Sequence, residues 1–421
     1  MNRLSSSLQF SSATCLVWGL LVVRLPASAL TVAFVDLHPA EASGSKVYAV
    51  NGTLQAGYFR INTTNHAALW SGTDGSVADL HPEGADSSTV YALFDAGAAG
   101  TFNTNGNSHA ALWSGASSAF ADLHPAGART SGVNGASDAF QVGFIQGEGV
   151  PPHAALWSGS AGSFMDLSPT GVDDSCLYAA CGSQFAGYAA GSDGAHHACL
   201  WPGASNSVVD LQPEMASNSV AYAISPVQQG GSAYIAGAIH AALWSSSANS
   251  FVDLHPAAAL QSVVKAMGGS MQAGVVTIDD GTGPANHAAL WSGTAESFVD
   301  LHSALGTNYE ASVALGLYSQ GSTTWVGGYA TTATGDHAIL WIVQPSPAPP
   351  AVEIAGVQKL SGANIVTLTW TNNGSSCVLE GSGSLRGSWS LISTPWTTNA
   401  NWVTAVVTNA ASAQFYRLRS N

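Results

Sequence analysis

The chain has 421 residues, of which only 8% are charged, and its 25 acidic and 10 basic residues give a formal net charge of −15. Nucleic-acid binding needs clustered Lys and Arg, so this composition argues against a nucleic-acid partner. The abundance of Trp, Val and Leu excludes disorder driven by charge repulsion. The length exceeds that of one compact core and predicts two domains or a repeat array.

Residues 1–29 have the pattern of a signal peptide. Arg3 supplies a positive start, residues 13–23 form an apolar run too short to span a bilayer, and residues 27–29 (Ala-Ser-Ala) match a cleavage site. Arg24 departs from this pattern and leaves an uncleaved N-terminal anchor as the alternative. No later stretch is long enough for a membrane span. We therefore expect a secreted protein, extracellular or at the cell surface, with no membrane span after cleavage.

Four markers recur seven times through residues 30–343, about every 43–50 residues. The string His-Ala-x-Leu-Trp begins at His66, His109, His153, His197, His240, His287 and His337. Asp-Leu-His-Pro or a close variant begins at Asp36, Asp79, Asp122, Asp166, Asp210, Asp253 and Asp300. A serine precedes a short apolar run at Ser45, Ser88, Ser131, Ser175, Ser219, Ser262 and Ser312. A glycine lies within an apolar run at Gly57, Gly100, Gly143, Gly187, Gly237, Gly274 and Gly328.

Each repeat unit contains four candidate strands, which in the first unit are residues 46–51, 54–59, 66–71 and 76–80. These runs are short, rich in Val, Tyr, Phe, Trp and Leu, and separated by turn residues. No apolar stripe of helical period is present, so helices should be nearly absent. Four short antiparallel strands in each unit are typical of a β-propeller blade.

The order of the two strings predicts how the repeat array ends. The array begins with Asp-Leu-His-Pro at Asp36 and ends with the string His337 to Trp341, so the two strings are offset by one strand. A closed ring explains this offset if residues 32–37 complete the last blade, because closure removes exposed strand edges. We predict an all-β protein, with a seven-bladed β-propeller over residues 30–343 closed by an N-terminal strand.

The repeated Ser, His and Asp invite comparison with a catalytic triad, but there are seven copies of each. A catalytic site needs one nucleophile in one special environment. We expect these side chains to bond to each other or to the backbone between strands, and we predict no catalytic residue and no cofactor. Ser168 and Gln212 replace the second histidine, which disfavours metal binding there. The pair His196-His197 beside Cys199 is the most metal-like cluster, but we assign no metal ligand.

The five cysteines do not form a disulfide framework. Cys15 leaves with the signal, Cys176, Cys181 and Cys199 fall in one unit, and Cys377 lies far away. No Cys-x-x-Cys pair is present, so a zinc site is disfavoured. The cysteines are interpreted as small apolar fillers.

The loops between the second and third strands vary most in length. Residues 146–152, 190–196 and 277–286 are long, whereas residues 238–239 leave almost no loop. Variation of this kind often marks a binding face, so this face is the predicted binding surface. Asp279 and Asp280 stand out there, and a solvated acidic turn is the alternative interpretation.

The unit that runs from His109 to Gly115 and then from Ala121 to Pro125 resembles the bacterial extracellular HAF repeat family. That family has roughly His-Ala-Phe-x-Trp, then Gly, then Asp-Leu-Gly. This chain has Ala for Phe and His-Pro where Gly is common. The resemblance covers all seven units and implies an extracellular repeat protein with no established catalytic activity.

Residues 344–350 form a proline-rich stretch that reads as a stiff linker. The remaining residues, 351–421, are predicted to form a small β-sandwich. Its candidate strands are residues 352–357, 365–370, 377–380, 388–392, 402–407 and 414–418. The segments Leu368–Trp370 and Phe415–Leu418 resemble a C-terminal sandwich module of secreted Verrucomicrobia-like proteins, which implies a role in attachment or export.

These features predict a secreted, monomeric, non-catalytic propeller that binds or scaffolds at the cell surface or in the extracellular matrix. Its expected partner is an extracellular glycan or protein. The alternative is a polysaccharide lyase or glycosidase, which needs paired carboxylates or another set that breaks the sevenfold pattern. A structural envelope protein is a third possibility. The basic residues of the propeller are scattered among the units: Lys46, Arg60, Arg129 and Lys265.

Overall fold

The computed structural model describes residues 30–345 except 74, 96, 116–118, 280 and 282. Beyond these it describes residues 354–359, 365–371, 377–382, 390–392, 396–398, 402–408 and 415–420. The predicted signal peptide and most of the predicted linker lie outside the described residues. The chain divides into two compact units, one of residues 30–344 and one that includes the segment from Pro345 to the C-terminus.

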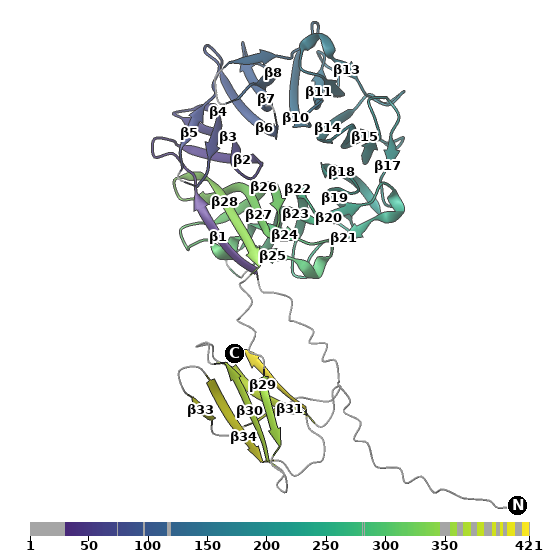
Figure 1. The fold of residues 1–421 in the computed structure, drawn as a ribbon. Helices are drawn as coiled ribbons and strands as arrows, with labels where there is room; N and C mark the ends of the chain where they lie inside the picture. Colours follow the sequence, from purple (N-terminus) through teal and green to yellow (C-terminus); the bar gives the residue numbers. More distant parts are fainter. Residues whose placement is uncertain are drawn as a thin grey trace, which may run out of the picture. The chain divides into compact units, whose positions relative to one another are not determined.

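The first unit contains seven four-stranded sheets, which Figure 1 shows around a common centre. The innermost strands are β2 (Gly44–Val50), β6 (Ser87–Phe94), β10 (Thr130–Ala136), β14 (Ser175–Cys181), β18 (Ala216–Ile224), β22 (Gln261–Gly268) and β26 (Ala311–Gln320). The second strands are β3 (Leu54–Ile61), β7 (Gly97–Thr104), β11 (Gln141–Gln146), β15 (Gln184–Ala190), β19 (Gln229–Ile235), β23 (Met271–Asp279) and β27 (Thr323–Thr332).

The third and outermost strands carry the two strings of the repeat. The third strands are β4 (Thr64–Ser71), β8 (Asn107–Trp113), β12 (His153–Trp157), β16 (His196–Trp201), β20 (Ala238–Trp244), β24 (Pro284–Trp291) and β28 (Gly335–Pro345). The outermost strands are β5 (Val77–Asp79), β9 (Phe120–Asp122), β13 (Met165–Asp166), β17 (Val209–Asp210), β21 (Val252–Asp253), β25 (Val299–Asp300) and β1 (Leu30–Asp36). Six sheets use consecutive strands, and the seventh has the order β1-β28-β27-β26.

Helical structure is minimal in the part of the chain that the structure describes. It is confined to the short 3₁₀ turns η1 (Ala161–Ser163), η2 (Ala248–Ser250), η3 (Ala295–Ser297) and η4 (His302–Ala304). The predictions of an all-β chain and of four-stranded repeat units are therefore confirmed. No helix within the described ranges has the length and apolar character needed to cross a membrane.

Two sequence-based boundaries need correction. Strand β28 continues to Pro345, and the side-chain amide of Gln344 donates to the hydroxyl of Thr323 at 3.0 Å, so the linker cannot begin at residue 344. The segment 277–286, predicted to be a loop, is mostly an extended hairpin in which Thr277 pairs with Asn286 and Asp279 pairs with Pro284.

The core of the first unit repeats with the sequence. The seven motif tryptophans, at positions 70, 113, 157, 201, 244, 291 and 341, are fully buried. Trp113 Nε1 donates to the carbonyl of Leu80, which follows the outer strand of the preceding sheet, at 2.9 Å. The Leu80 amide in turn donates to the carbonyl of Ala67 at 2.8 Å. Each tryptophan thus buries a large apolar surface, and this one also joins two neighbouring sheets.

The described part of the second unit forms two sheets. Their strands are β29 (Ile354–Lys359), β30 (Ile365–Thr371), β31 (Cys377–Ser382), β32 (Ser390–Leu391), β33 (Trp396–Thr398), β34 (Trp402–Thr408) and β35 (Phe415–Ser420). The sheet orders are β29-β30-β34-β33 and β32-β31-β35. Strand β33 was not predicted. Leu368, Leu379 and Ala405 are buried.

Candidate functional site: the central channel

The inner strand of every sheet in the first unit carries a β-bulge at the same position. In β2, Val47 pairs with Gly57 and Ala49 pairs with Ala56, so Tyr48 has no partner in the register. The same interruption occurs in the inner strand of each of the other six sheets. A bulge adds one residue to a strand and redirects its side chain. Here it turns one side chain from each sheet toward the centre.

The repeated glycine permits this bulge. A Cβ atom on Gly57 would collide with the carbonyl oxygen of Lys46, which the bulge brings over the second strand. The corresponding glycine of the fifth unit is Gly231, which pairs with Ala221, and its Cβ would collide with the carbonyl of Val220. The prediction that Gly237 is the marker was therefore wrong. Gly237 lies in a turn with φ of 94°.

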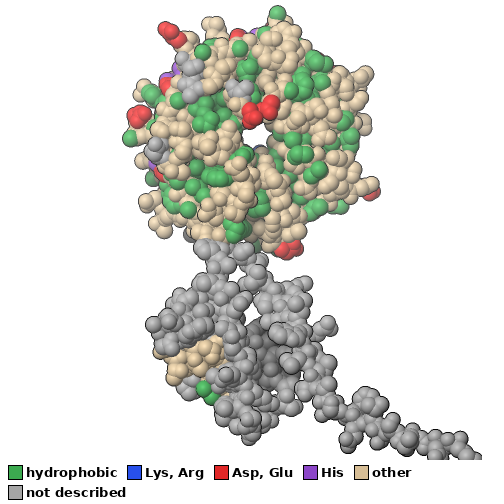
Figure 2. Space-filling model, in the orientation of Figure 1, with side chains coloured by type: hydrophobic (Ala, Val, Ile, Leu, Met, Phe, Trp, Pro, Cys, Tyr) green, Lys and Arg blue, Asp and Glu red, His purple; other side chains and the backbone are tan. Residues whose placement is uncertain are grey.

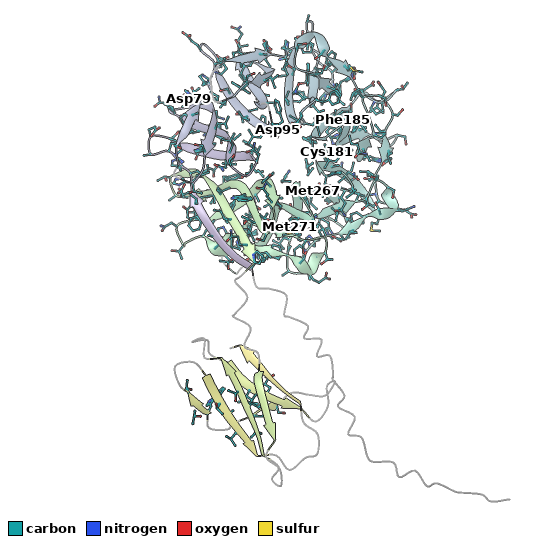
Figure 3. The ribbon with its side chains drawn as sticks, viewed as in Figure 1. Asp79, Asp95, Cys181, Phe185, Met267 and Met271 are labelled. Atoms are coloured by element: carbon teal, nitrogen blue, oxygen red, sulfur yellow. The ribbon has the colours of Figure 1, made fainter. Side chains whose placement is uncertain are left out.

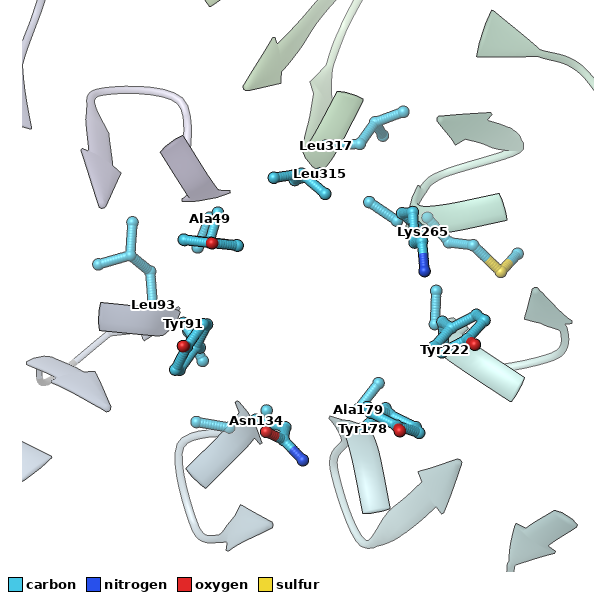
Figure 4. Close-up of a pocket in the computed structure, with 18 of the residues that line it drawn as sticks. Ala49, Tyr91, Leu93, Asn134, Tyr178, Ala179, Tyr222, Lys265, Leu315 and Leu317 are labelled. Atoms are coloured by element: carbon cyan, nitrogen blue, oxygen red, sulfur yellow. The ribbon is translucent and has the colours of Figure 1, made fainter. Parts of the chain in front are cut away.

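The seven redirected side chains line a central channel, and we call them the channel ring. In chain order they are Tyr48, Tyr91, Asn134, Tyr178, Tyr222, Lys265 and Leu315. Figure 4 shows those of its members that it labels facing the open centre. Each belongs to a different sheet, so the ring is asymmetric although the fold repeats. Every sheet therefore places one side chain at the same position, but the chemistry of that side chain differs between sheets.

The ring tyrosines form two neighbouring pairs. Tyr48 and Tyr91 meet edge to face with ring centroids 4.9 Å apart, and Tyr178 and Tyr222 meet at 5.0 Å. Burial raises the pKa of all four phenols. At neutral pH they are uncharged groups that can donate hydrogen bonds. They offer a ligand both aromatic faces and hydroxyl groups.

The channel has the dimensions of a small-molecule site. Its volume is about 410 Å³, and most of the remaining lining is Ala, Gly, Val, Leu, Ile and Met from the same strands. Small-molecule pockets span about 300–1,000 Å³ and combine apolar walls with a few polar groups. The side-chain amide of Asn134 already donates one hydrogen bond within the protein, to the carbonyl of Leu177 at 2.9 Å.

One opening of the channel is acidic. Figure 2 shows acidic side chains beside the opening, and Figure 3 places Asp95 close to it. The Asp95 backbone amide donates to the carboxylate of Asp138 at 3.1 Å. Two carboxylates from neighbouring sheets therefore lie near each other at this rim.

The repeated Ser, His and Asp lie away from the channel; Figure 3 shows Asp79 at the periphery. His66 Nδ1 lies 2.8 Å from Asp79 Oδ2, while Asp79 Oδ1 accepts from the His81 amide at 2.8 Å. His81 Nδ1 lies 2.8 Å from Ser88 Oγ, which also accepts from the Ala67 amide at 2.8 Å. The expected bonding between these residues is confirmed, and we call this arrangement the junction network.

The junction network also stacks its histidines. In four units the second histidine stacks on the first, with ring centroids 3.8–4.1 Å apart, and His302 lies against His287 at 4.3 Å with the two rings tilted by 30°. Ser168 and Gln212 take the place of the second histidine elsewhere. Ser168 bonds to Ser175 at 2.9 Å, and Gln212 bonds to Ser219. The repeated serine therefore has a hydrogen-bonding partner in these two units as well.

The other residues singled out from the sequence lie outside the channel. Asp279 is exposed and caps a local turn by accepting from the Gly281 amide at 2.9 Å, whereas Asp280 lies outside the described residues. His196 contacts Asp174 at 3.1 Å and stacks on Tyr188 at 4.0 Å. No group of three or more His, Cys, Asp or Glu side chains within the described ranges converges as a metal site requires.

Cys176, Cys181 and Cys199 are unpaired. Burial raises the pKa of Cys176 and of Cys199 to about 12, and it also raises the pKa of Cys181. Thiols of this kind are poor nucleophiles because the reactive form is the thiolate. Their packing agrees with the interpretation of these residues as apolar fillers.

Sequence reasoning missed the channel ring, although a signal for it was present. The ring position lies three residues after the repeated serine. Its residue is Tyr in four units and Asn, Lys or Leu in the other three, while the serine before it stays constant. The recurrence of a large polar or aromatic residue at this position, in six of the seven units, could have drawn attention to it. The prediction instead followed loop length.

No family model matches the sequence, and no curated protein matches it. Among solved structures, TolB from Acinetobacter baumannii matches 62% of this chain and 64% of its own, at 12% identity and a TM-score of 0.42. Puromycin hydrolase matches 80% of this chain and 61% of its own, at 12% identity and a TM-score of 0.47. A puromycin-hydrolyzing peptidase from Mycobacterium tuberculosis matches 82% and 61%, at the same identity and TM-score. This chain spans about three fifths of the length of these structures.

These matches correct one prediction. The chain was expected to be a non-catalytic binding or scaffold protein, yet the structures that resemble it include enzymes, among them puromycin hydrolase. The non-catalytic assignment is therefore withdrawn.

Proposed function

We propose that the functional site is the central channel and that it takes up a small organic molecule. The observation that carries this proposal is the bulge in each of the seven inner strands, which redirects one side chain per sheet into a single space of about 410 Å³. A purely structural centre would be filled by apolar side chains. This one instead presents four phenols, an amide and an amine.

Saturation-transfer NMR with phenol, benzoate and methyl glucoside as probes tests this proposal. We expect at least one probe to bind the parent protein. Its binding should be lost in the double variant Tyr91→Ala/Tyr178→Ala. Leu315→Trp, which narrows the channel without removing a tyrosine, should also weaken binding. Tyr234→Ala is the matched control, because Tyr234 is 43% exposed on β19 and does not line the channel. Absence of binding, or binding unaffected by both channel variants, refutes the proposal.

We further propose that the seven sheets form a closed seven-bladed propeller. Support comes from the junction between the first and last strands, which repeats the contacts of an internal junction. His337 Nδ1 lies 2.8 Å from Asp36 Oδ2, and the Ala338 amide donates to Ser45 Oγ at 2.9 Å. Leu37, just after β1, is fully buried and donates its amide to the Ala338 carbonyl at 2.9 Å.

Thermal unfolding of matched variants tests closure. Deletion of residues 30–40 should lower the melting temperature, because β1 and its junction are lost. Asp36→Ala should destabilise the protein at least as much as Asp79→Ala, since each aspartate accepts from one histidine of its own sheet and Asp36 also accepts from the Tyr309 hydroxyl at 3.0 Å. A deletion variant that melts like the parent contradicts the closed ring.

We also propose that the two sheets of the second unit pack as a β-sandwich and that residues 1–29 direct secretion. Buried side chains on both sheets, Leu368 and Leu379 among them, support the first proposal. The apolar run and the Ala-Ser-Ala site support the second. Limited proteolysis should release the second unit as a stable fragment. N-terminal sequencing of protein from the medium of expressing bacteria should begin at Leu30.

A further inference from the structure

Lys265 is exceptional among the residues that line the channel. The described lining contains no Asp, Glu, Arg or second Lys, so its ammonium group is the only formal charge there. Figure 4 shows the side chain reaching into the open centre. Its Nζ lies 3.8 Å from the centroid of the Tyr222 ring, a cation–π contact.

Lys46, the other lysine of the first unit, differs from Lys265 in being paired with a carboxylate. Lys46 Nζ lies 2.9 Å from Asp336 and 3.6 Å from the Tyr329 ring centroid. Both lysines therefore have an aromatic face, but only Lys46 also has a carboxylate. Among the described residues, no acidic side chain pairs with Lys265, and burial lowers its pKa.

A partly buried ammonium group without an anion costs free energy. The aromatic face of Tyr222 offsets only part of this cost, because a cation–π contact is individually modest. A hydrophobic residue would be the less costly choice at this position, as Leu315 shows in the adjacent sheet. The amine is explained if a ligand supplies the missing negative charge.

The surroundings define the class of ligand. One ammonium group balances one negative charge, and the acidic rim near Asp95 opposes the entry of multiply charged anions. The apolar walls and the tyrosine faces suit an aromatic or aliphatic body, and the phenol hydroxyls can donate to a carboxylate. We infer that the channel binds a small organic monocarboxylate, held by Lys265. This inference rests on the proposed function of the channel.

Titration calorimetry with benzoate, its neutral analogue benzamide, and inorganic phosphate tests the inference. Benzoate should bind the parent protein more tightly than benzamide and phosphate. Lys265→Met removes the charge but keeps a long side chain. It should weaken the binding of benzoate by about tenfold or more and leave the binding of benzamide unchanged. Raising the salt concentration should weaken the binding of benzoate but not that of benzamide.

Two further measurements separate anion recognition from a structural role. Lys265→Met should melt no lower than the parent, because it removes an unpaired buried amine. Leu315→Lys adds a second amine to the adjacent sheet and should favour the dicarboxylate terephthalate over benzoate.

The outcomes distinguish this inference from the proposed function. Equal binding of benzoate and benzamide, tighter binding of phosphate, or an equal loss of both aromatic probes in Lys265→Met overturns the role of Lys265. In each of these cases, probe binding that is lost in Tyr91→Ala/Tyr178→Ala still supports a ligand-binding channel. Failure of every probe to bind refutes the channel proposal itself.

Discussion

Replacing the five second histidines, each of which lies against a first histidine, by glutamine should make the protein less sensitive to acid. These histidines are His38, His81, His124, His255 and His302. Burial, and then the adjacent histidine, lowers the pKa of each below 6.5. The unfolded chain therefore binds more protons than the folded one just below pH 6.5. Stability should be fully present above that pH and should fall as the pH drops through the folded-state pKa values.

The magnitude follows from proton linkage. Each histidine that is neutral when folded and protonated when unfolded contributes a slope of about 1.4 kcal/mol per pH unit. Five such histidines give at most about 7 kcal/mol per pH unit. This slope applies only between the folded-state pKa values and 6.5, so the total loss of stability depends on how far burial lowers those pKa values.

Glutamine is the appropriate replacement because the fifth unit already uses it. His124 Nε2 donates to the Ala128 carbonyl at 3.1 Å, so its Nδ1 accepts from Ser131 at 2.8 Å. Gln212 makes the equivalent bonds, donating to the Ala216 carbonyl at 2.7 Å and accepting from the serine of its own unit. The substitutions at His38, His124 and His255, which all contact the equivalent carbonyl, should therefore cost no more than about 1 kcal/mol each above neutral pH.

Urea unfolding followed by tryptophan fluorescence at about pH 8 and about pH 5.5 measures the effect. The parent should lose much more stability between the two conditions than the five-glutamine variant. The first histidines, which contact aspartates, remain in both proteins. Gln212→His, which adds a second histidine next to His197, should increase the loss. Equal losses in the parent and the five-glutamine variant would refute the reasoning.

Three further predictions concern packing and reactivity. Gly143→Ala should destabilise the protein by more than about 2 kcal/mol in urea unfolding, because its Cβ meets the backbone of the bulge. Gly162→Ala, whose Cβ has open space, should have little effect. Ser131→Ala should cost about 1–3 kcal/mol in the same assay, because it removes the shared partner of a buried backbone amide and a histidine. Cys176 and Cys199 should resist iodoacetamide in the native protein and react only in denaturant, as mass spectrometry can show; rapid native labelling would contradict their burial.

The repeat units and the junction network were predictable because they depend on local patterns. His-Ala-x-Leu-Trp and Asp-Leu-His-Pro occur seven times each, and four strands per unit follow from their turn residues. The contact between His66 and Asp79 follows from strand pairing, in which Ala68 faces Asp79. Repetition made the fold class and the repeated polar contacts visible without a structure.

The channel ring could not be derived in the same way, because a bulge depends on the register between two strands. The pattern of alternating residues gives no sign that Tyr48 lacks a partner while Val47 and Ala49 have one. The choice of Gly237 instead of Gly231 had the same origin, since both lie in or beside apolar runs and only the pairing with Ala221 separates them. The extended hairpin after Thr277 likewise looked like a loop because it is rich in polar residues.

The bulge makes the seven centre-facing residues replaceable one at a time. A bulged residue has no partner in the ladder, so a new side chain there leaves the strand pairing intact. The chain already carries four residue types at this position: Tyr, Asn, Lys and Leu. Combinatorial variation at seven such positions would change the chemistry of the centre while the surrounding framework stays the same. This fold is therefore a scaffold on which selectivity can evolve, or be engineered, independently of folding.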